Sequence, residues 1–359
     1  MISADRSHRG ELRENTVAAK RQAAYAEQLG DLDIIGFSLA RDGFVPTRLS
    51  SHARTYPTGS SSKFLYGFDA LRIARRLPMP DVITAQDPFE TGFVAWLIAR
   101  RLGVPLHVQV HTDFLSAAYR RHSLLNRVRV WIARFVLSRA AGVRVVSERI
   151  ANSLRTTHYA LRTTPSVLPI FVDFDRFRHA SHDAALEVRF ALYETKLLVV
   201  SRLEKEKNVA LALHACKESA PRDACLIIVG DGSEREALEA MARALGIRGQ
   251  VFFEGAHDAA SYYKMADLVL VPSRYEGYGL VIVEALAAGK PVLSTDVGIA
   301  DEAGATITSE ALFGQTLARW FSEGPREGVL RGYPYASFDE YVRAYRDDIA
   351  ACIEPEKGQ

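Results

Sequence analysis

The chain has 359 residues, of which 48% are apolar and 25% are charged. This composition is typical of a globular protein, and the length exceeds that of one core, so we expect two domains. No apolar run approaches the roughly eighteen residues of a transmembrane helix, and the first ten residues lack the apolar stretch of a signal peptide. Three scattered cysteines, Cys216, Cys225 and Cys352, argue against a disulfide framework and favour a reduced, cytoplasmic setting.

Charge is unevenly distributed along the chain although the net charge is only +2. Residues 1–180 hold 26 lysines and arginines against 15 acidic residues, a balance of +11, whereas the remainder holds 19 against 28, a balance of −9. The basic first half predicts an anionic partner, either a membrane surface or an acidic acceptor. Chance variation between two domains explains the asymmetry equally well. No helix-turn-helix, zinc or RNA-recognition signature is present, so we expect no nucleic-acid partner.

The first half alternates predicted strands and helices. Met1–Ala4 is predicted as the tail of a strand leading into a segment with a single glycine, Gly10. Then follow a helix, a strand, an irregular surface loop with two prolines and a serine run, and a second helix, at residues 14–29, 33–39, 44–62 and 63–77. Strands joined by crossover helices predict a Rossmann-like parallel sheet.

Two later strands of this half end in polar residues. One ends at Gln86-Asp87-Pro88, and the next, in PLHVQVHTDF, presents His111 and Asp113. Ligands of open α/β sheets bind at the carboxyl ends of the strands. Asp87 is therefore an acceptor-side candidate. His111 fits either a structural role or contact with a ligand.

Ser123–Arg139 predicts a basic amphipathic helix. Its apolar stripe, Leu124, Val128, Trp131, Ile132 and Phe135, alternates with four arginines. Two alternatives stay open. The stripe either packs on the domain's own sheet, or it contacts an anionic membrane surface.

The predicted domain boundary follows strands at residues 142–147 and 166–171. We assign residues 1–180 to the first domain and residues 181–336 to the second, with a final amphipathic helix, Phe338–Ile353, within 337–359. Apolar strands of the second domain occur in KLLVVSRLEKEKN, ACLIIVGDGSEREALE, QVFFEGAH and ADLVLVPS. After Gly298 the pattern becomes less regular.

The segment Val271–Gly298 predicts a strand, a loop with Gly277 and Gly279, a helix from Leu280 and a second strand. Glu276 lies in the loop and Glu284 in the early helix, with seven residues between them. The N–H groups of Tyr278, Gly279 and Leu280 lie at the helix N-terminus, where the dipole favours an anion. Carboxylates accept hydrogen bonds from hydroxyls, so this arrangement suits a nucleotide sugar.

The spacing of Glu276 and Glu284 within PSRYEGYGLVIVEALAAGKPV resembles an element of retaining GT-B glycosyltransferases, the glycosyltransferase family 4 or "group 1" type. The resemblance covers roughly residues 81–298 and, less securely, the terminal helix. It implies two Rossmann-like domains facing across a cleft, with the C-terminal helix returning to the first. It also implies a retaining hexosyltransferase that moves a sugar from a UDP- or GDP-linked donor to an acceptor hydroxyl, in glycan or glycolipid synthesis.

By the same resemblance, Arg202 and Lys207 of VSRLEKEKN bind the donor diphosphate and Glu276 binds the donor sugar. Glu284 binds the ribose, and Gly255 and His257 border the base. His111 approaches the donor sugar from the first domain. GDGSER, at residues 230–235, has only the first two glycines of a dinucleotide fingerprint, so it predicts a tight turn rather than a cofactor site.

We expect no metal and no cofactor. Asp31-x-Asp33 and Asp173-x-Asp175 match a short pattern of metal-dependent transferases, but neither lies at a persuasive strand end. Two other functions stay open: a non-catalytic nucleotide-sugar-binding protein, and an NAD-dependent oxidoreductase that lacks a proper fingerprint.

Overall fold

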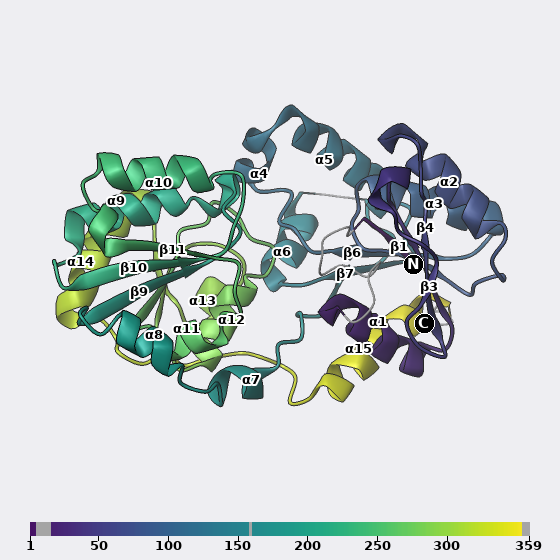
Figure 1. Ribbon diagram of the computed structural model, residues 1–359. Coiled ribbons are helices and arrows are strands. Elements are labelled where there is room, and N and C mark those ends of the chain that lie inside the picture. The colour runs from purple at the N-terminus through teal and green to yellow at the C-terminus, as the bar shows by residue number, and fades with distance from the viewer. Residues whose placement is uncertain (5–15, 158–159, 354–359) are drawn as a thin grey trace. The chain divides into compact units, whose positions relative to one another are not determined.

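A computed structural model describes residues 1–4, 16–157 and 160–353 of the chain. These residues form two compact units. Unit 1 comprises the chain up to Pro169 together with the part from Tyr335 onward, and unit 2 comprises Ile170–Pro334. Each unit is built around one sheet of mainly parallel strands (Figure 1).

Unit 1 contains an eight-stranded sheet with the order β3-β4-β2-β1-β5-β6-β7-β8. All pairs are parallel except β3 with β4, which is antiparallel. The strands are β1 Ile2–Ser3, β2 Leu32–Gly36, β3 Thr47–Arg48, β4 Ala53–Pro57, β5 Ile83–Ala85, β6 Leu106–Val110, β7 Gly142–Val145 and β8 Ser166–Val167. Because the chain winds outward in both directions from β1, the topological switch point lies between β1 and β5.

The helices of unit 1 are α1 Val17–Leu29, α2 Tyr66–Ala74, α3 Glu90–Leu102, α4 Ala117–His122, α5 Leu124–Leu137, α6 Glu148–Thr156 and α15 Phe338–Ile353. The predicted bounds of the last helix are confirmed, and α15 returns to unit 1. There Tyr25 of α1 lies 4.9 Å from Tyr345, measured between ring centroids.

One prediction for this unit is wrong. Residues 44–62 were expected to form an irregular loop, but they contain β3 and β4, and β4 pairs with β2 along its whole length. Ala53 and Thr55 are fully buried, whereas Arg54 between them is exposed. The strand is short and mostly polar, so its alternation of apolar and polar residues is weak in the sequence. Burial against the rest of the sheet stabilises it. Strand β1 confirms that Met1–Ala4 contributes a strand, but the segment with Gly10 lies outside the described residues.

Unit 2 contains a six-stranded, fully parallel sheet with the order β11-β10-β9-β12-β13-β14. Its strands are β9 Thr195–Val200, β10 Ala224–Val229, β11 Val251–Gly255, β12 Leu268–Val271, β13 Val292–Thr295 and β14 Thr306–Thr308. This is the Rossmann order, with the switch point between β9 and β12.

Helices cover both faces of this sheet (Figure 1). They are α7 Phe174–Arg178, α8 Ala184–Arg189, α9 Val209–Ser219, α10 Arg235–Ala244, α11 Ala260–Met265, α12 Leu280–Ala287, α13 Ala300–Ala303 and α14 Phe313–Glu323. Apolar residues of α9, α10 and α14 form one core with Leu197 and Val199 of β9. The strands are apolar on both faces because both faces are covered.

Two expectations for unit 2 need correction. The change of unit occurs at Pro169 rather than after residue 180, because α7 packs on unit 2, where the Phe177 ring lies 5.8 Å from the ring of Tyr263. The chain after Gly298 is also more regular than expected, since it forms α13, β14 and α14. These elements are short or carry mixed polarity, so their periodicity is weak in the sequence.

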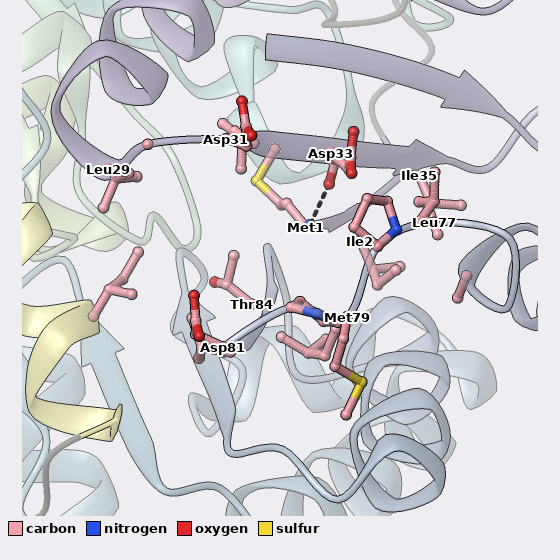
Figure 2. Close-up of a pocket in the computed structure, with 18 of the residues that line it drawn as sticks. Met1, Ile2, Leu29, Asp31, Asp33, Ile35, Leu77, Met79, Asp81 and Thr84 are labelled. Atoms are coloured by element: carbon pink, nitrogen blue, oxygen red, sulfur yellow. Dashed lines mark hydrogen bonds between the residues drawn. The ribbon is translucent and has the colours of Figure 1, made fainter. Parts of the chain in front are cut away.

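A cavity of about 520 Å³ lies in unit 1 at the amino-terminal edge of its sheet. Figure 2 shows its lining, where the Met1 nitrogen donates to the Asp33 carbonyl oxygen at 2.6 Å, with Asp31 and Asp81 nearby. Ligands of parallel sheets bind at the opposite edge, so this cavity is not the candidate site. Within the described ranges, no helix has both the length and the apolar content needed to cross a membrane.

Candidate functional site

The candidate site of unit 2 lies at the carboxyl edge of its sheet, at the switch point between β9 and β12. Strand β9 ends at Val200, and Arg202 and Lys207 follow it, the latter at the end of a 3-10 turn, Lys205–Lys207. Asn208 takes a left-handed conformation, with φ of 50°, and starts α9. This sharp turn holds both cations beside the strand end.

Lys207 and Glu276 form the central ion pair of this edge. The ammonium donates to Oε1 of Glu276 at 2.6 Å, and each side chain is only 16% exposed. The Ser273 hydroxyl donates to the same oxygen at 2.9 Å. The structure therefore brings together two of the predicted residues, which are 69 positions apart in the chain.

Arg202 differs from Lys207 in its surroundings. Its guanidinium donates to Glu206 at 3.0 Å, but its side chain is 70% exposed. An exposed ion pair of this kind contributes little stability. Arg202 is thus open to an anionic ligand at the end of β9.

Glycines shape the loop between β12 and α12. Gly279 takes a φ of 93° directly before α12, and a Cβ there would lie 2.9 Å from the Ile282 side chain. Tyr278 is buried, and its carbonyl accepts a hydrogen bond from the Ile299 amide at 3.0 Å. Gly277 precedes this turn, and Leu280 is the first residue of α12. The helix N-terminus, with its positive dipole end, thus follows Glu276 directly.

Glu284 lies one turn into α12 and has different partners from Glu276. The Tyr263 hydroxyl donates to its Oε2 at 2.8 Å. Burial raises the pKa of Glu284 above its ordinary value, while the bond from Tyr263 and the charge of Arg176 oppose that rise. A partly buried carboxylate with few donors can gain stability from hydroxyl groups of a ligand.

Arg176 was missed by the sequence analysis. It lies on α7, where its amide hydrogen-bonds the Asp173 side chain and its guanidinium donates to Asp258 at 2.7 Å. Its charge acts on Glu284. Arg176 belongs to the segment FVDFDRF, which the sequence analysis assigned to the first domain and therefore did not connect with the site of the second.

The turn at residues 230–233 supports the β9 loop. The amides of Ser201 and Leu203 bond Val229 and Asp231, and a Cβ on Gly230 would lie 1.8 Å from the Ser201 carbonyl oxygen. The Ser233 hydroxyl donates to Glu204 at 2.8 Å. The glycines therefore serve close backbone approach, in agreement with a tight turn rather than a cofactor fingerprint.

Gly255 is the last residue of β11, and His257 follows this strand beside the turn at residues 230–233. The Gly255 carbonyl accepts from the Gly230 amide at 2.7 Å, and its φ is 81°. His257 is exposed, with its ring 6.3 Å from that of Tyr262. Their predicted contact with a base stays a prediction.

In unit 1, Asp87 and His111 follow β5 and β6, which are neighbouring strands. Asp87 accepts a hydrogen bond at 2.8 Å from the amide of Phe89, the residue that precedes α3. Nε2 of His111 lies 3.2 Å from Oε1 of Gln109. Burial, aided by nearby positive charge, lowers the pKa of His111 to about 3.

The paired aspartates serve local structure. Asp31 contacts His52 at 3.3 Å, and Asp173 caps α7. Nowhere in the described part of the chain do three histidine, cysteine or acidic side chains gather as ligands for a metal ion.

The two-unit architecture is that of GT-B proteins. Sucrose-phosphate synthase from Thermosynechococcus elongatus matches with a TM-score of 0.74 at 18% identity, over 99% of this chain and 95% of that chain. HepE from Anabaena, in complex with UDP-glucose, matches with a TM-score of 0.69 at 16% identity, over 97% and 94% of the two chains.

Sequence comparison then identifies the family. The model "Glycosyl transferases group 1" matches residues 187–306, and "Glycosyl transferase 4-like domain" matches residues 16–169. The chain belongs to the group 1 glycosyltransferases of the GT-B fold.

Two relatives match this chain at about 30% identity. The 2-deoxystreptamine glucosyltransferase of Streptomyces kanamyceticus is 32% identical over 64% of this chain and 63% of its own length. The alpha-monoglucosyldiacylglycerol synthase of Streptococcus pneumoniae is 30% identical over 65% and 56%. The matches thus span less than two thirds of these relatives.

Proposed function

We propose that this protein transfers a sugar from a UDP- or GDP-linked donor to an acceptor hydroxyl, with retention at the anomeric carbon. The observation that carries the proposal is the Lys207–Glu276 pair beside Arg202 at the switch point of the unit 2 sheet. Two cations and a helix N-terminus suit a diphosphate, and a carboxylate among them suits sugar hydroxyls. HepE, of the same fold, is described in complex with UDP-glucose.

In this proposal the donor rearranges the ion pair. Lys207 turns from Glu276 to the diphosphate, and Arg202 clamps the diphosphate with its planar fork. Glu276 then accepts hydrogen bonds from the sugar. Because negative charge builds on the leaving diphosphate as the glycosidic C–O bond breaks, both cations stabilise the transition state more than the ground state.

No protein nucleophile is needed. The acceptor oxygen bonds to the anomeric carbon on the face that the diphosphate leaves, and the departing diphosphate takes the acceptor proton. The enzyme contributes positioning and charge stabilisation. Glu284 holds the ribose, the amides of residues 277–280 hold phosphate, and the turn at Gly255 and His257 borders the base.

A thermal-shift panel of UDP, GDP, ADP and NAD is the first test. Selective stabilisation by UDP or GDP supports the proposal, because a ligand stabilises the folded state that binds it. Stabilisation by NAD alone would instead support an oxidoreductase. Turnover of the matching nucleotide sugar then separates an enzyme from a non-catalytic nucleotide-sugar-binding protein.

The acceptor side of the proposal is a lipid or lipid-linked glycan at an anionic cytoplasmic membrane surface. Leu124, Val128 and Trp131 of α5 are 75%, 53% and 72% exposed, which counts against the alternative that the stripe is core. Phe135 packs instead on Trp96 of α3, with ring centroids 4.7 Å apart.

Arginines accompany this exposed stripe. Arg120, Arg121, Arg127 and Arg134 line a groove of about 450 Å³ together with Trp131. Each basic residue near an anionic surface contributes about 1 kcal/mol, so docking should be reversible and sensitive to salt. The lipid named for the Streptococcus pneumoniae relative is consistent with such an acceptor.

Liposome flotation at low salt tests the membrane proposal. We expect recovery with phosphatidylglycerol vesicles but not with neutral vesicles, and loss of recovery in Trp131→Ala combined with Arg127→Ala. Leu192→Ala is the matched control, because Leu192 is 90% exposed but lies in unit 2. Equal recovery with both vesicle types would leave a soluble acceptor as the better account.

A further inference from the structure

A buried polar network in unit 1 connects β6 and β7 with α15. Gln109 of β6, Arg144 of β7 and Tyr345 of α15 are 4%, 2% and 2% exposed. Arg144 donates through Nη1 to Oε1 of Gln109 at 3.1 Å and through Nη2 to the Tyr341 hydroxyl at 2.8 Å. Burial alone would lower the pKa of Arg144, but the oxygens of Tyr341, Tyr345 and Tyr25 raise it above its ordinary value, so the guanidinium stays charged.

Arg144 determines which way the Gln109 amide points. A guanidinium only donates hydrogen bonds, so the amide atom that faces it must be the oxygen. The amide nitrogen then donates to the Tyr345 hydroxyl at 2.8 Å and to the Thr84 hydroxyl at 3.2 Å, both of which can accept. Each polar atom of the amide has a partner of the correct kind.

The orientation of Gln109 in turn determines the tautomer of His111. Nε2 of His111 lies 3.2 Å from the same amide oxygen, and an amide oxygen only accepts. Nε2 must therefore carry the proton. Among the described residues, none forms a hydrogen bond with Nδ1.

We propose that Gln109 and Arg144 are positioning residues that hold His111 as the neutral Nε2–H tautomer, with Nδ1 as a hydrogen-bond acceptor for a substrate hydroxyl. The identity of that hydroxyl rests on the proposed glycosyl transfer, whereas the tautomer does not. In this role His111 is not a cation and does not neutralise the leaving diphosphate. That task falls to Arg202 and Lys207.

The charges around His111 support a neutral ring. Arg144 from β7, Arg21 from α1 and His107 from β6 all disfavour the imidazolium, in addition to burial. The two carboxylates near this edge differ in their partners. Asp348 of α15 contacts Nε2 of His107 at 2.9 Å, whereas Asp113 lies near the charge of Arg149 and its buried Oδ1 has no hydrogen-bond partner among the described residues.

NMR of protein labelled with ¹⁵N-histidine tests the tautomer directly on the wild-type chain. The His111 signals, assigned by their loss in His111→Asn, should show the Nε2–H pattern without titration from pH 8 to pH 5. A proton on Nδ1, or a titration midpoint near the ordinary histidine value of about 6.5, would overturn the proposal.

A charge variant tests the positioning role. Gln109→Glu keeps the shape and gives Arg144 a carboxylate partner, so it should fold and raise the His111 midpoint by at least about 1 pH unit. As the pH is lowered, its kcat/KM should begin to fall at a higher pH than that of wild type or of the exposed control Gln315→Glu. An unchanged midpoint in Gln109→Glu would refute the coupling.

The outcomes separate this inference from the proposed function. Wild-type turnover in His111→Asn would refute the proposed contact between His111 and a substrate hydroxyl. Absence of transfer with every nucleotide sugar, together with the expected spectrum, would refute the proposed function and leave the tautomer assignment in place.

Discussion

The Lys207–Glu276 pair allows a sharp test of the donor site. Lys207→Met removes the ammonium but keeps most of the length of the side chain. In the free protein, Glu276 then retains the hydrogen bond from Ser273 at 2.9 Å and loses the charged partner at 2.6 Å. We expect a modest loss of stability and a larger loss of affinity for a nucleoside diphosphate.

The magnitude follows from the contact that is removed. A hydrogen bond to a charged group contributes about 1.5–3 kcal/mol, which corresponds to a roughly 10- to 150-fold weaker Kd. The stability loss should lie at or below the lower end of that range, because both side chains are partly exposed to screening solvent, at 16% each. Affinity for the matching nucleoside, which lacks phosphates, should stay the same.

Isothermal titration calorimetry with the nucleoside diphosphate and its nucleoside measures this difference. Lys205→Met is the matched control, because Lys205 lies in the same 3-10 turn but is exposed. We expect wild-type binding in the control and a selective loss of diphosphate binding in Lys207→Met. Equal binding of the diphosphate by both variants would refute the assignment of Lys207. An equal loss for nucleoside and diphosphate would show general disruption instead.

Three further predictions concern the same unit. Glu276→Ala should abolish transfer, whereas Glu284→Ala should mainly weaken binding of the nucleoside by about 1–3 kcal/mol; wild-type turnover in both variants would contradict these roles. EDTA, Mg²⁺ and Mn²⁺ should change the rate little, because in the proposed function Arg202 and Lys207 take the place of a metal ion. Loss of activity in EDTA that Mn²⁺ restores would contradict this expectation. Gly230→Ala should lower Tm clearly, because its Cβ would lie 1.8 Å from the Ser201 carbonyl oxygen. Gly249→Ala should change Tm little, because the space around Gly249 is open. Similar Tm values for the two variants would argue against the close approach at Gly230.

The sequence by itself determined the elements with strong periodicity and the residues at strand ends. Local sequence patterns predict the apolar strands β9, β10 and β12 and the final helix α15. Apolar runs and helical repeats of this kind can be recognised within a short stretch of the sequence. The loop and helix start between Glu276 and Glu284 could also be predicted, since the glycines and carboxylates that form them are adjacent in the chain. The short strand β4 could not be predicted from the sequence, because its stability comes from pairing with β2.

Only the tertiary structure decided which of these residues meet. It pairs Lys207 with Glu276 and places Arg176 where its charge acts on Glu284. It also leaves three residues of the apolar stripe of α5 exposed, namely Leu124, Val128 and Trp131. It also placed Arg144, Gln109 and His111 in one chain of hydrogen bonds on two neighbouring strands. Such contacts depend on which strands are neighbours and on where buried charges find partners. Both are set by packing over the whole unit, so no local sequence pattern contains them.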